Sequence, residues 1–387
     1  MIGVDSVSRL NMIRHLKRTR HFLLDRMQAL DLEDYNKVGL NTFPNILPMM
    51  TGHAMKEFNR SVLKTQHLDT LHLGVQKRRI PYALRRGPPR NLHLQLPQGR
   101  RVFRDKPHFA FTFLTASTHE DVNGASQVDG YHARYLSSLV EEGLVNNTLL
   151  IFFSDHGIRW GPVRNTPQGG RPFMYLAFPS RFREEHPELM QRVQKNAARL
   201  VTPFDIHATL LDVLYRVPGV YRQKSSAENK GISLFDEISP ERTCADAGIP
   251  LPFCVCVETH PLNTSSPTGQ QAGAALVASL NAAMTQANVT GKCHMLQLGK
   301  VTNLQQIGGA EHYMKKKCER VSSTDVEVFR VRITTKPRAA QFEAFMFRCE
   351  VTGWKLTVHG EVDRLNEYGD SSYCVDEGFL KKVCYCK

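Results

Sequence analysis

The chain has 387 residues, of which 41% are hydrophobic and 22% charged, a composition typical of a globular protein with one large α/β domain and a smaller appendage. It contains no apolar run of about 18 residues, so no membrane-spanning helix is expected in it, and no signal peptide is visible. The net charge is +13, and much of the excess lies in residues 54–106, which include the runs Lys77–Arg79, Arg85–Arg86 and Arg100–Arg101.

The first predicted element is a buried strand at residues 1–4, which ends at Asp5. A helix is expected at 11–30 and another from Asn45. Further strands are predicted at 109–114, 148–153 and 173–178, with helices at 127–142 and 202–214. Strands that alternate with helices predict an α/β fold with a largely parallel sheet flanked by helices, in which ligands bind at the carboxyl ends of the strands. Because the chain opens directly on a strand, we expect a truncated N-terminus.

The alternating pattern ends near residue 243, which predicts a domain over 1–243. Residues 244–290 are expected to be a cysteine-containing extension and linker, because 260–290 are rich in Thr, Ser, Ala, Gln and Gly. Residues 291–387 contain alternating stretches such as Val328–Thr334 and Trp354–His359. They predict a small β-rich, disulfide-bonded module.

Residues 54–106 form an atypical basic segment. One interpretation is a surface that binds phosphate, nucleic acid or sulfated polysaccharide, because clustered Lys and Arg attract polyanions. The alternative is an insert without fixed structure, or sequence that has replaced part of the domain. Specific nucleic-acid binding is disfavoured, because Phe58, Tyr82 and Phe103 are too sparse for a base-stacking platform.

All nine cysteines follow Thr243, and this concentration predicts disulfides in an oxidising compartment. Zinc binding by Cys254/Cys256 or Cys384/Cys386 is the weaker alternative, because Cys-x-Cys lacks the usual ligand gap. Sequons at Asn59, Asn146, Asn263 and Asn288 agree with secretion, and the last three are our candidate glycosylation sites. We therefore expect an extracellular or secretory-lumenal protein.

Polar residues follow the predicted strands in a pattern that suits a metal. Asp5 ends the first strand, and Asp155 and His156 end a later one. Two carboxylates and an imidazole can hold a divalent ion, for which zinc is favoured and calcium or magnesium are alternatives. Thr42 lies in a turn before a helix, where a metal would lower the pKa of its hydroxyl and the helix N-terminus would favour an anionic substrate.

These segments, Gly3–Arg9, Asn41–Asn45 and Ser154–Gly157, resemble the alkaline phosphatase superfamily. The Asn-Thr-Phe-Pro-Asn sequence is similar to the phosphodiesterase branch, whose nucleophile is a Thr. Sulfatases use a Cys or Ser that is converted to formylglycine, so Thr42 disfavours sulfatase activity. Longer stretches at 35–39, 154–159, 202–210 and 242–250 resemble an animal family, domain of unknown function 229, over roughly residues 1–52 and 107–256.

The resemblance implies an extracellular or lumenal sulfatase-like domain, often anchored in the membrane at its N-terminus, without an assigned substrate. Candidate substrate contacts are His119, Asp121, Arg9 and Arg159. Candidates for a second metal, each more easily explained as a structural residue, are Asp129, His132 and His207. Family members carry a strand and an acidic motif where 54–106 stands here, and a longer stretch near Gly169–Arg171.

Two functions therefore stay open. The first is a metal-dependent hydrolase of a phosphate ester or phosphodiester, with Thr42 as nucleophile and an anionic small molecule or a glycan or lipid phosphate as substrate. The second is a non-catalytic secreted binding protein, which keeps the fold and binds polyanions with its basic segment. Bound divalent metal would separate them.

Overall fold

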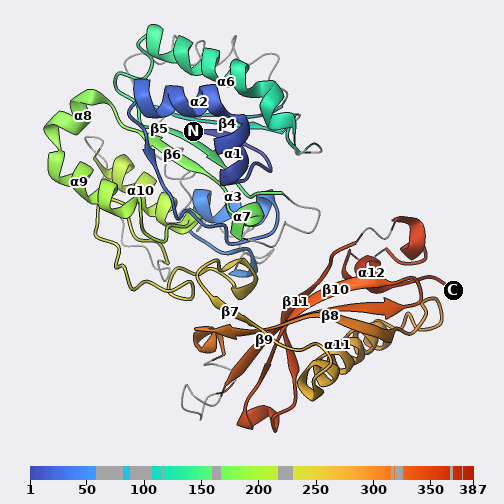
Figure 1. Ribbon diagram of the computed structural model, residues 1–387. Coiled ribbons are helices and arrows are strands. Elements are labelled where there is room, and N and C mark those ends of the chain that lie inside the picture. Colours follow the sequence, from blue (N-terminus) through green and yellow to red (C-terminus); the bar gives the residue numbers. More distant parts are fainter. Residues whose placement is uncertain are drawn as a thin grey trace. The chain divides into compact units, whose positions relative to one another are not determined.

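The computed structural model describes residues 1–57, 82–87, 107–115, 117–119, 121, 123–158, 167–216, 230–314, 318, 326–366, 369–376 and 378–387. They form two compact units that divide between Val255 and Cys256 (Figure 1). The structure describes only residues 54–57 and 82–87 of the basic segment 54–106. The polyanion binding predicted for this segment therefore falls on residues outside the described ones. In the described part of the chain, no helix is long and apolar enough to cross a membrane.

The first unit is built on a six-stranded sheet in the order β2-β6-β5-β1-β4-β3. Its strands are β1 (Ile2–Val4), β2 (Leu30–Asp31), β3 (Tyr82–Gly87), β4 (Phe109–Leu114), β5 (Leu150–Ser154) and β6 (Met174–Ala177). The central β1 pairs in parallel with both β4 and β5, so that Val4 lies opposite Leu114 on one side and Ser154 on the other. The residues that follow β1 and β5 therefore emerge at the same edge of the sheet.

The α/β class is confirmed, but the sheet is mixed rather than largely parallel. β3, β4, β1 and β5 are mutually parallel, whereas β6 is antiparallel to both β5 and β2. A parallel return needs a crossover connection of a dozen or more residues, usually a helix. Between β5 and β6 the only described helix is the single turn α7 (Pro167–Gly170), and the chain comes back in the opposite direction.

Helices cover both faces of this sheet (Figure 1). On one face, α1 (Arg9–His15), α2 (Lys17–His21) and α6 (Gly124–Glu141) pack over a core that contains Val4, Leu136 and Phe152. On the other, α3 (Thr42–Thr51), α9 (Pro187–Asn196) and α10 (Pro203–Tyr215) enclose a core with Phe113 and Phe153. Successive strand residues alternate between the two cores, as a sheet covered on both sides requires. The short helices α8 (Ser180–Glu185) and η2 (Met55–Glu57) complete this unit, together with η4 (Leu251–Phe253).

The helix expected at 11–30 is broken into α1, α2 and a π-helical turn η1 (Phe22–Arg26), and the chain then enters β2. The break falls at Leu16, whose backbone leaves the helical region. Asp129 of α6 stabilises the start of α2 after this break, because its carboxylate accepts hydrogen bonds from the backbone N–H groups of Arg18 and Thr19. A tertiary contact thus overrides a continuous local pattern.

The second unit is a five-stranded antiparallel sheet in the order β11-β10-β9-β8-β7. Its strands are β7 (Glu258–Pro261), β8 (Gln297–Gly308), β9 (Glu327–Lys336), β10 (Ala340–Arg348) and β11 (Thr357–Arg364). The helix α11 (Pro267–Gln286) packs against the sheet, and α12 (Gly378–Val383) lies near the C-terminus. The loops of this unit contain the single helical turns η5 (Glu311–Tyr313), η7 (Glu350–Thr352) and η8 (Gly369–Ser372).

The linker expected within 260–290 is wrong, because residues 267–286 form α11. Its sequence lacks charge and resembles a flexible segment, but alanine is the strongest helix former. Ala272, Leu276, Leu280 and Met284 recur at every fourth position and are buried against the sheet. This spacing places one apolar stripe on one face of a helix.

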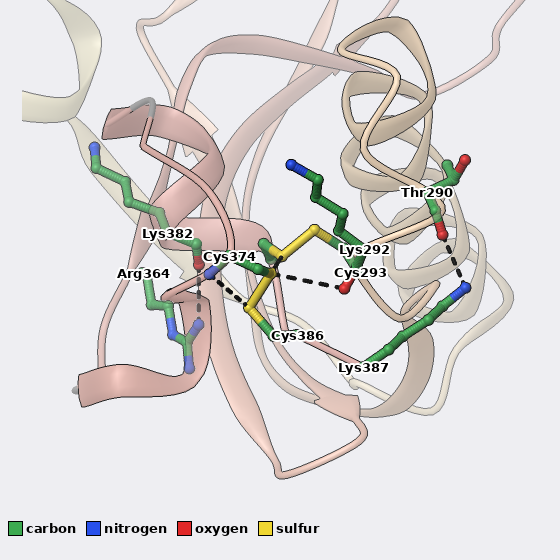
Figure 2. Close-up of a disulfide and its surroundings, with 9 residues drawn as sticks. Thr290, Lys292, Cys293, Arg364, Cys374, Lys382, Cys386 and Lys387 are labelled. Carbon is green, nitrogen blue, oxygen red and sulfur yellow. Dashed lines mark hydrogen bonds between the residues drawn. A yellow bond between two sulfur atoms is a disulfide. The ribbon is translucent and has the colours of Figure 1, made fainter.

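Four disulfides join described cysteines, as the sequence predicted: Cys244–Cys254, Cys293–Cys384, Cys318–Cys349 and Cys374–Cys386. Cys256 is exposed and lies outside these bridges. The bridges of Cys384 and Cys386 lie side by side, with Cys374 Sγ 3.6 Å from Cys384 Sγ. Figure 2 shows Cys374 and Cys386 beside Cys293. They clamp the last residues beside the segment that follows α11, where Lys387 N donates to the Lys292 carbonyl at 2.9 Å.

Candidate functional site

Asp5, Asp155 and His156 converge at the carboxyl edge of the first sheet. Asp5 follows β1 and Asp155 follows the neighbouring β5, and all three side chains are fully buried. One ligand atom from each lies within 4.8 Å of the others. His156 Nε2 is 3.2 Å from Asp155 Oδ2 and 3.8 Å from Asp5 Oδ1. The parallel register of β1 and β5 brings these residues together although they lie about 150 positions apart.

The orientation of His156 is set by its other ring nitrogen. Nδ1 lies 2.7 Å from the Gly157 carbonyl oxygen, a contact that makes Nδ1 a protonated donor and turns Nε2 toward the carboxylates. Gly157 is required here, because a Cβ at this position would lie 2.0 Å from the Gly169 carbonyl oxygen. The Asp-His-Gly sequence therefore combines two ligands with the close approach that orients one of them.

Ser6 bridges the two carboxylates, a role that sequence reasoning missed. Its hydroxyl donates to Asp5 Oδ1 at 2.8 Å, and its backbone N–H donates to Asp155 Oδ1 at 3.2 Å. To do so, Ser6 adopts a φ of 62°, which is uncommon for a residue with a side chain. No sequence signal marks it, because a serine after a strand is ordinary.

The electrostatics of this group suit a cation. Burial and the nearby Asp155 charge raise the pKa of Asp5. Burial also raises the pKa of Asp155, opposed by hydrogen bonds from the Thr42 side chain and from the N–H groups of Ser6 and His156. Asp5 Oδ2 has no hydrogen-bond partner among the residues that the structure describes. Two buried carboxylates with an open oxygen and an imidazole nitrogen fit a divalent ion.

Thr42 reaches the same group from α3, where it is the first helical residue and its side chain lowers the pKa of the Asp155 carboxyl. Asn45 fixes the preceding loop: its Oδ1 accepts from the N–H groups of Val38 and Gly39 at 2.8 and 3.0 Å, and its Nδ2 donates to the carbonyls of Gly39 and Asn41. The last residue of the Asn-Thr-Phe-Pro-Asn sequence thus holds the loop that presents Thr42.

The predicted substrate contacts have different surroundings. His119 is half-buried, and its charge favours the ionised form of Asp5, which places it near the group. Asp121 is exposed and accepts a hydrogen bond from the N–H of Asn123 in the turn before α6. Arg9 forms an ion pair with Asp31. Arg159 lies outside the described residues.

None of the three second-metal candidates joins the described group of Asp5, Asp155 and His156. Asp129 stabilises the start of α2 through the N–H groups described above. His132 is buried against Phe152, with ring centroids 5.7 Å apart. His207 is buried in α10, with Nδ1 3.3 Å from the carbonyl oxygen of Met49. The structure supplies a packing contact for each.

The stretches around 202–210 and 242–250 hold the fold rather than the site. The buried Asp205 receives two hydrogen bonds of 2.9 Å from the Arg242 guanidinium and closes a capping box with Thr202 at the start of α10. Its Oδ1 also accepts from the N–H of Ile232 at 2.7 Å. This network joins α10 to the segment that leads into the Cys244–Cys254 bridge.

Comparison with solved structures gives weak similarities. Lipoteichoic acid synthase LtaP from Listeria monocytogenes is 8% identical with a TM-score of 0.37; the match covers 46% of this chain and 64% of that one, less than two thirds of its length. An alkaline phosphatase superfamily protein from Vibrio parahaemolyticus is 11% identical, with a TM-score of 0.44 and coverage of 99% and 83%. Phosphonate monoester hydrolase SpPMH from Silicibacter pomeroyi is 10% identical, with a TM-score of 0.42 and coverage of 90% and 88%. Such values carry no argument about activity.

No curated protein matches the sequence at a significant level. A family model, described as "Protein of unknown function (DUF229)", matches residues 1–73 and 92–302. The match spans well over half of the chain and leaves out residues 74–91 within the basic segment. The resemblance expected from the sequence is thereby confirmed, and the protein belongs to the DUF229 family.

Proposed function

We propose that the protein is a metal-dependent hydrolase of a phosphate ester or phosphodiester. Asp5, Asp155 and His156 would hold the metal, and Thr42 would be the nucleophile. The observation that carries the proposal is the convergence of three buried ligands within 4.8 Å, with the Thr42 side chain near enough to Asp155 to lower the pKa of its carboxyl. Zinc is favoured by the imidazole and the small ligand set, with calcium or magnesium as alternatives.

A bound divalent ion would lower the pKa of the Thr42 hydroxyl and neutralise the buried carboxylates. The chain supplies the rest. The N-terminus of the ten-residue α3 carries partial positive charge, so that it favours an anionic ester beside Thr42. The Asn45 network fixes the Thr42 backbone, which limits the freedom lost when a substrate is positioned. His119, near Asp5, remains a proposed substrate contact.

The location proposed is the secretory lumen or the cell exterior, because disulfides persist where the medium is oxidising. There the substrate would be an anionic small molecule or a glycan or lipid phosphate. The competing proposal is a non-catalytic binding protein that retains this fold and recognises polyanions. Sulfatase activity is disfavoured, because a threonine cannot form the formylglycine that sulfatases use.

The test is metal-dependent turnover of an aryl phosphate and an aryl phosphodiester. Thr42→Ala should abolish turnover while the protein keeps its bound metal, whereas Thr42→Ser, which retains a hydroxyl, should keep part of the activity. Asp155→Asn should lose metal, and added ion should partly restore turnover. An active parent with an equally active Thr42→Ala variant would remove Thr42 as the nucleophile. A parent protein that binds metal but has no turnover would support the proposal of a non-catalytic binding protein. A parent protein that binds no metal would refute the proposal of a metal-dependent hydrolase.

A further inference from the structure

The outer face of α11 carries no charge. None of its 20 residues is Asp, Glu, Lys, Arg or His. One side is buried in the core of the second unit, and the positions exposed after Pro267 are Gln, Ala and Thr, among them Gln271, Ala274, Ala278 and Ala282. A surface helix normally carries charged residues opposite its apolar stripe, and uncharged surface promotes association.

Both ends of α11 carry glycosylation sequons. Asn263 precedes the helix in Asn263-Thr264-Ser265; it is exposed, and its side-chain oxygen accepts from the N–H of Ser265 at 2.9 Å in a turn after β7. Asn288 follows the helix in Asn288-Val289-Thr290; it is exposed and adopts a φ of 56°. Two acceptors thus flank one helix, which at about 1.5 Å per residue separates them by roughly 30 Å.

The redox chemistry of the same unit points to the compartment in which such sequons are used. Cys293, which follows the second sequon closely, forms a disulfide with Cys384, and the Cys374–Cys386 disulfide lies beside that bridge. Figure 2 shows Thr290 beside α11 at the edge of this cluster, where its carbonyl oxygen accepts from Lys387 Nζ at 2.9 Å. Disulfides form in the oxidising lumen of the secretory pathway, where exposed sequons are glycosylated.

We propose that Asn263 and Asn288 carry N-linked glycans, which cover the uncharged outer face of α11 and keep it from associating. In N-glycosylation an oligosaccharide is transferred from a lipid-linked donor, and the side-chain nitrogen of each Asn forms a bond to the anomeric carbon of that oligosaccharide. The bond between that carbon and the diphosphate of the lipid-linked donor breaks. The amide loses one proton and the lipid diphosphate leaves. The proposal does not depend on hydrolase activity, because both asparagines lie in the second unit.

The modification is tested on the full chain secreted from a eukaryotic host behind a signal peptide. Intact and peptide masses are measured before and after treatment with an N-glycosidase. Ser265→Ala and Thr290→Ala each destroy a sequon and should each remove one glycan. Thr264→Ala and Val289→Ala change the neighbouring residue, keep the sequon and should leave the glycan in place. Unmodified Asn263 and Asn288 in the secreted parent would overturn the proposal.

The covering role is tested by light scattering over a range of protein concentrations. The molar mass of the parent should stay constant over this range. The Ser265→Ala/Thr290→Ala double variant should begin to self-associate at a lower protein concentration than the parent does. Asn146→Gln, which removes an exposed sequon of the first unit, should behave like the parent. If the double variant does not accumulate, enzymatically deglycosylated native parent supplies the same comparison. Association that is unchanged after removal of both glycans would overturn the covering role.

Discussion

Acid should destabilise this protein through two buried histidines. His132 lies on α6 between Tyr131 and Phe152, and His207 lies on α10 against the Met49 carbonyl. Burial lowers the pKa of both to about 4, a shift that Asp129 opposes at His132 and that the Met49 contact opposes at His207. Both rings are therefore neutral in the folded protein at physiological pH.

The sign follows from the unfolded state, in which a histidine has its ordinary pKa of about 6.5. The unfolded chain binds more protons than the folded chain between pH 6.5 and about 4, so stability is complete above this window and is lost as pH falls through it. A pKa difference of this size is worth at most about 3 kcal/mol per histidine, and about 2 kcal/mol at pH 5.

The assay is urea denaturation at pH 7 and pH 5, followed by far-UV circular dichroism. His132→Phe keeps an aromatic ring against Phe152 and cannot titrate, so it should lose about 2 kcal/mol less than the parent between the two pH values. His312→Gln is the control, because His312 is exposed and forms no ion pair with the residues that the structure describes, so its removal tests the loss of a histidine as such. This control should lose as much as the parent. Other titrating groups cancel in the comparison. A His132→Phe variant with the parent's full acid loss would refute the reasoning.

Three further changes test one support of the fold and two supports of the site. Arg242→Met should leave the Asp205 carboxylate buried without its guanidinium and lower the free energy of unfolding by about 3–5 kcal/mol in urea denaturation. Asn45→Ala should cost about 2–4 kcal/mol in the same assay, because buried backbone groups before Thr42 lose their partners. Gly157→Ala should weaken metal binding in calorimetric titration, since its Cβ would meet the Gly169 carbonyl, while circular dichroism stays close to that of the parent.

The grouping of Asp5, Asp155 and His156 could be predicted because it follows from local rules. Each residue ends a short apolar strand, and parallel strands deliver their ends to one edge. The direction of β6 could not be predicted, because a strand buried on both faces has the same apolar sequence whichever way it runs.

The second-metal candidates show a different limit of the sequence. Asp129 and His132 share a helix face at a spacing of three residues, which predicts neighbouring side chains. In the structure, Asp129 turns to the backbone of α2 and His132 to the sheet. Similarly, composition alone predicted a linker where α11 forms, because this helix is rich in Thr, Ser, Ala, Gln and Gly, which are also common in flexible segments. Tertiary partners decide such cases, and a single sequence does not contain them.

The central position of β1 has a consequence for how the protein folds. Val4 pairs with Leu114 and Ser154, which lie about 110 and 150 residues further along the chain. β1 can therefore pair with β4 and β5 only after these distant segments have come together. Contacts of such long sequence separation close slowly, because the entropy of the intervening loop is lost before the contact stabilises the chain. Asp5 meets Asp155 and His156 only when this closure is complete. An ion that needs all three ligands would therefore bind after the slow step, slowing the unfolding of the finished sheet without accelerating its formation.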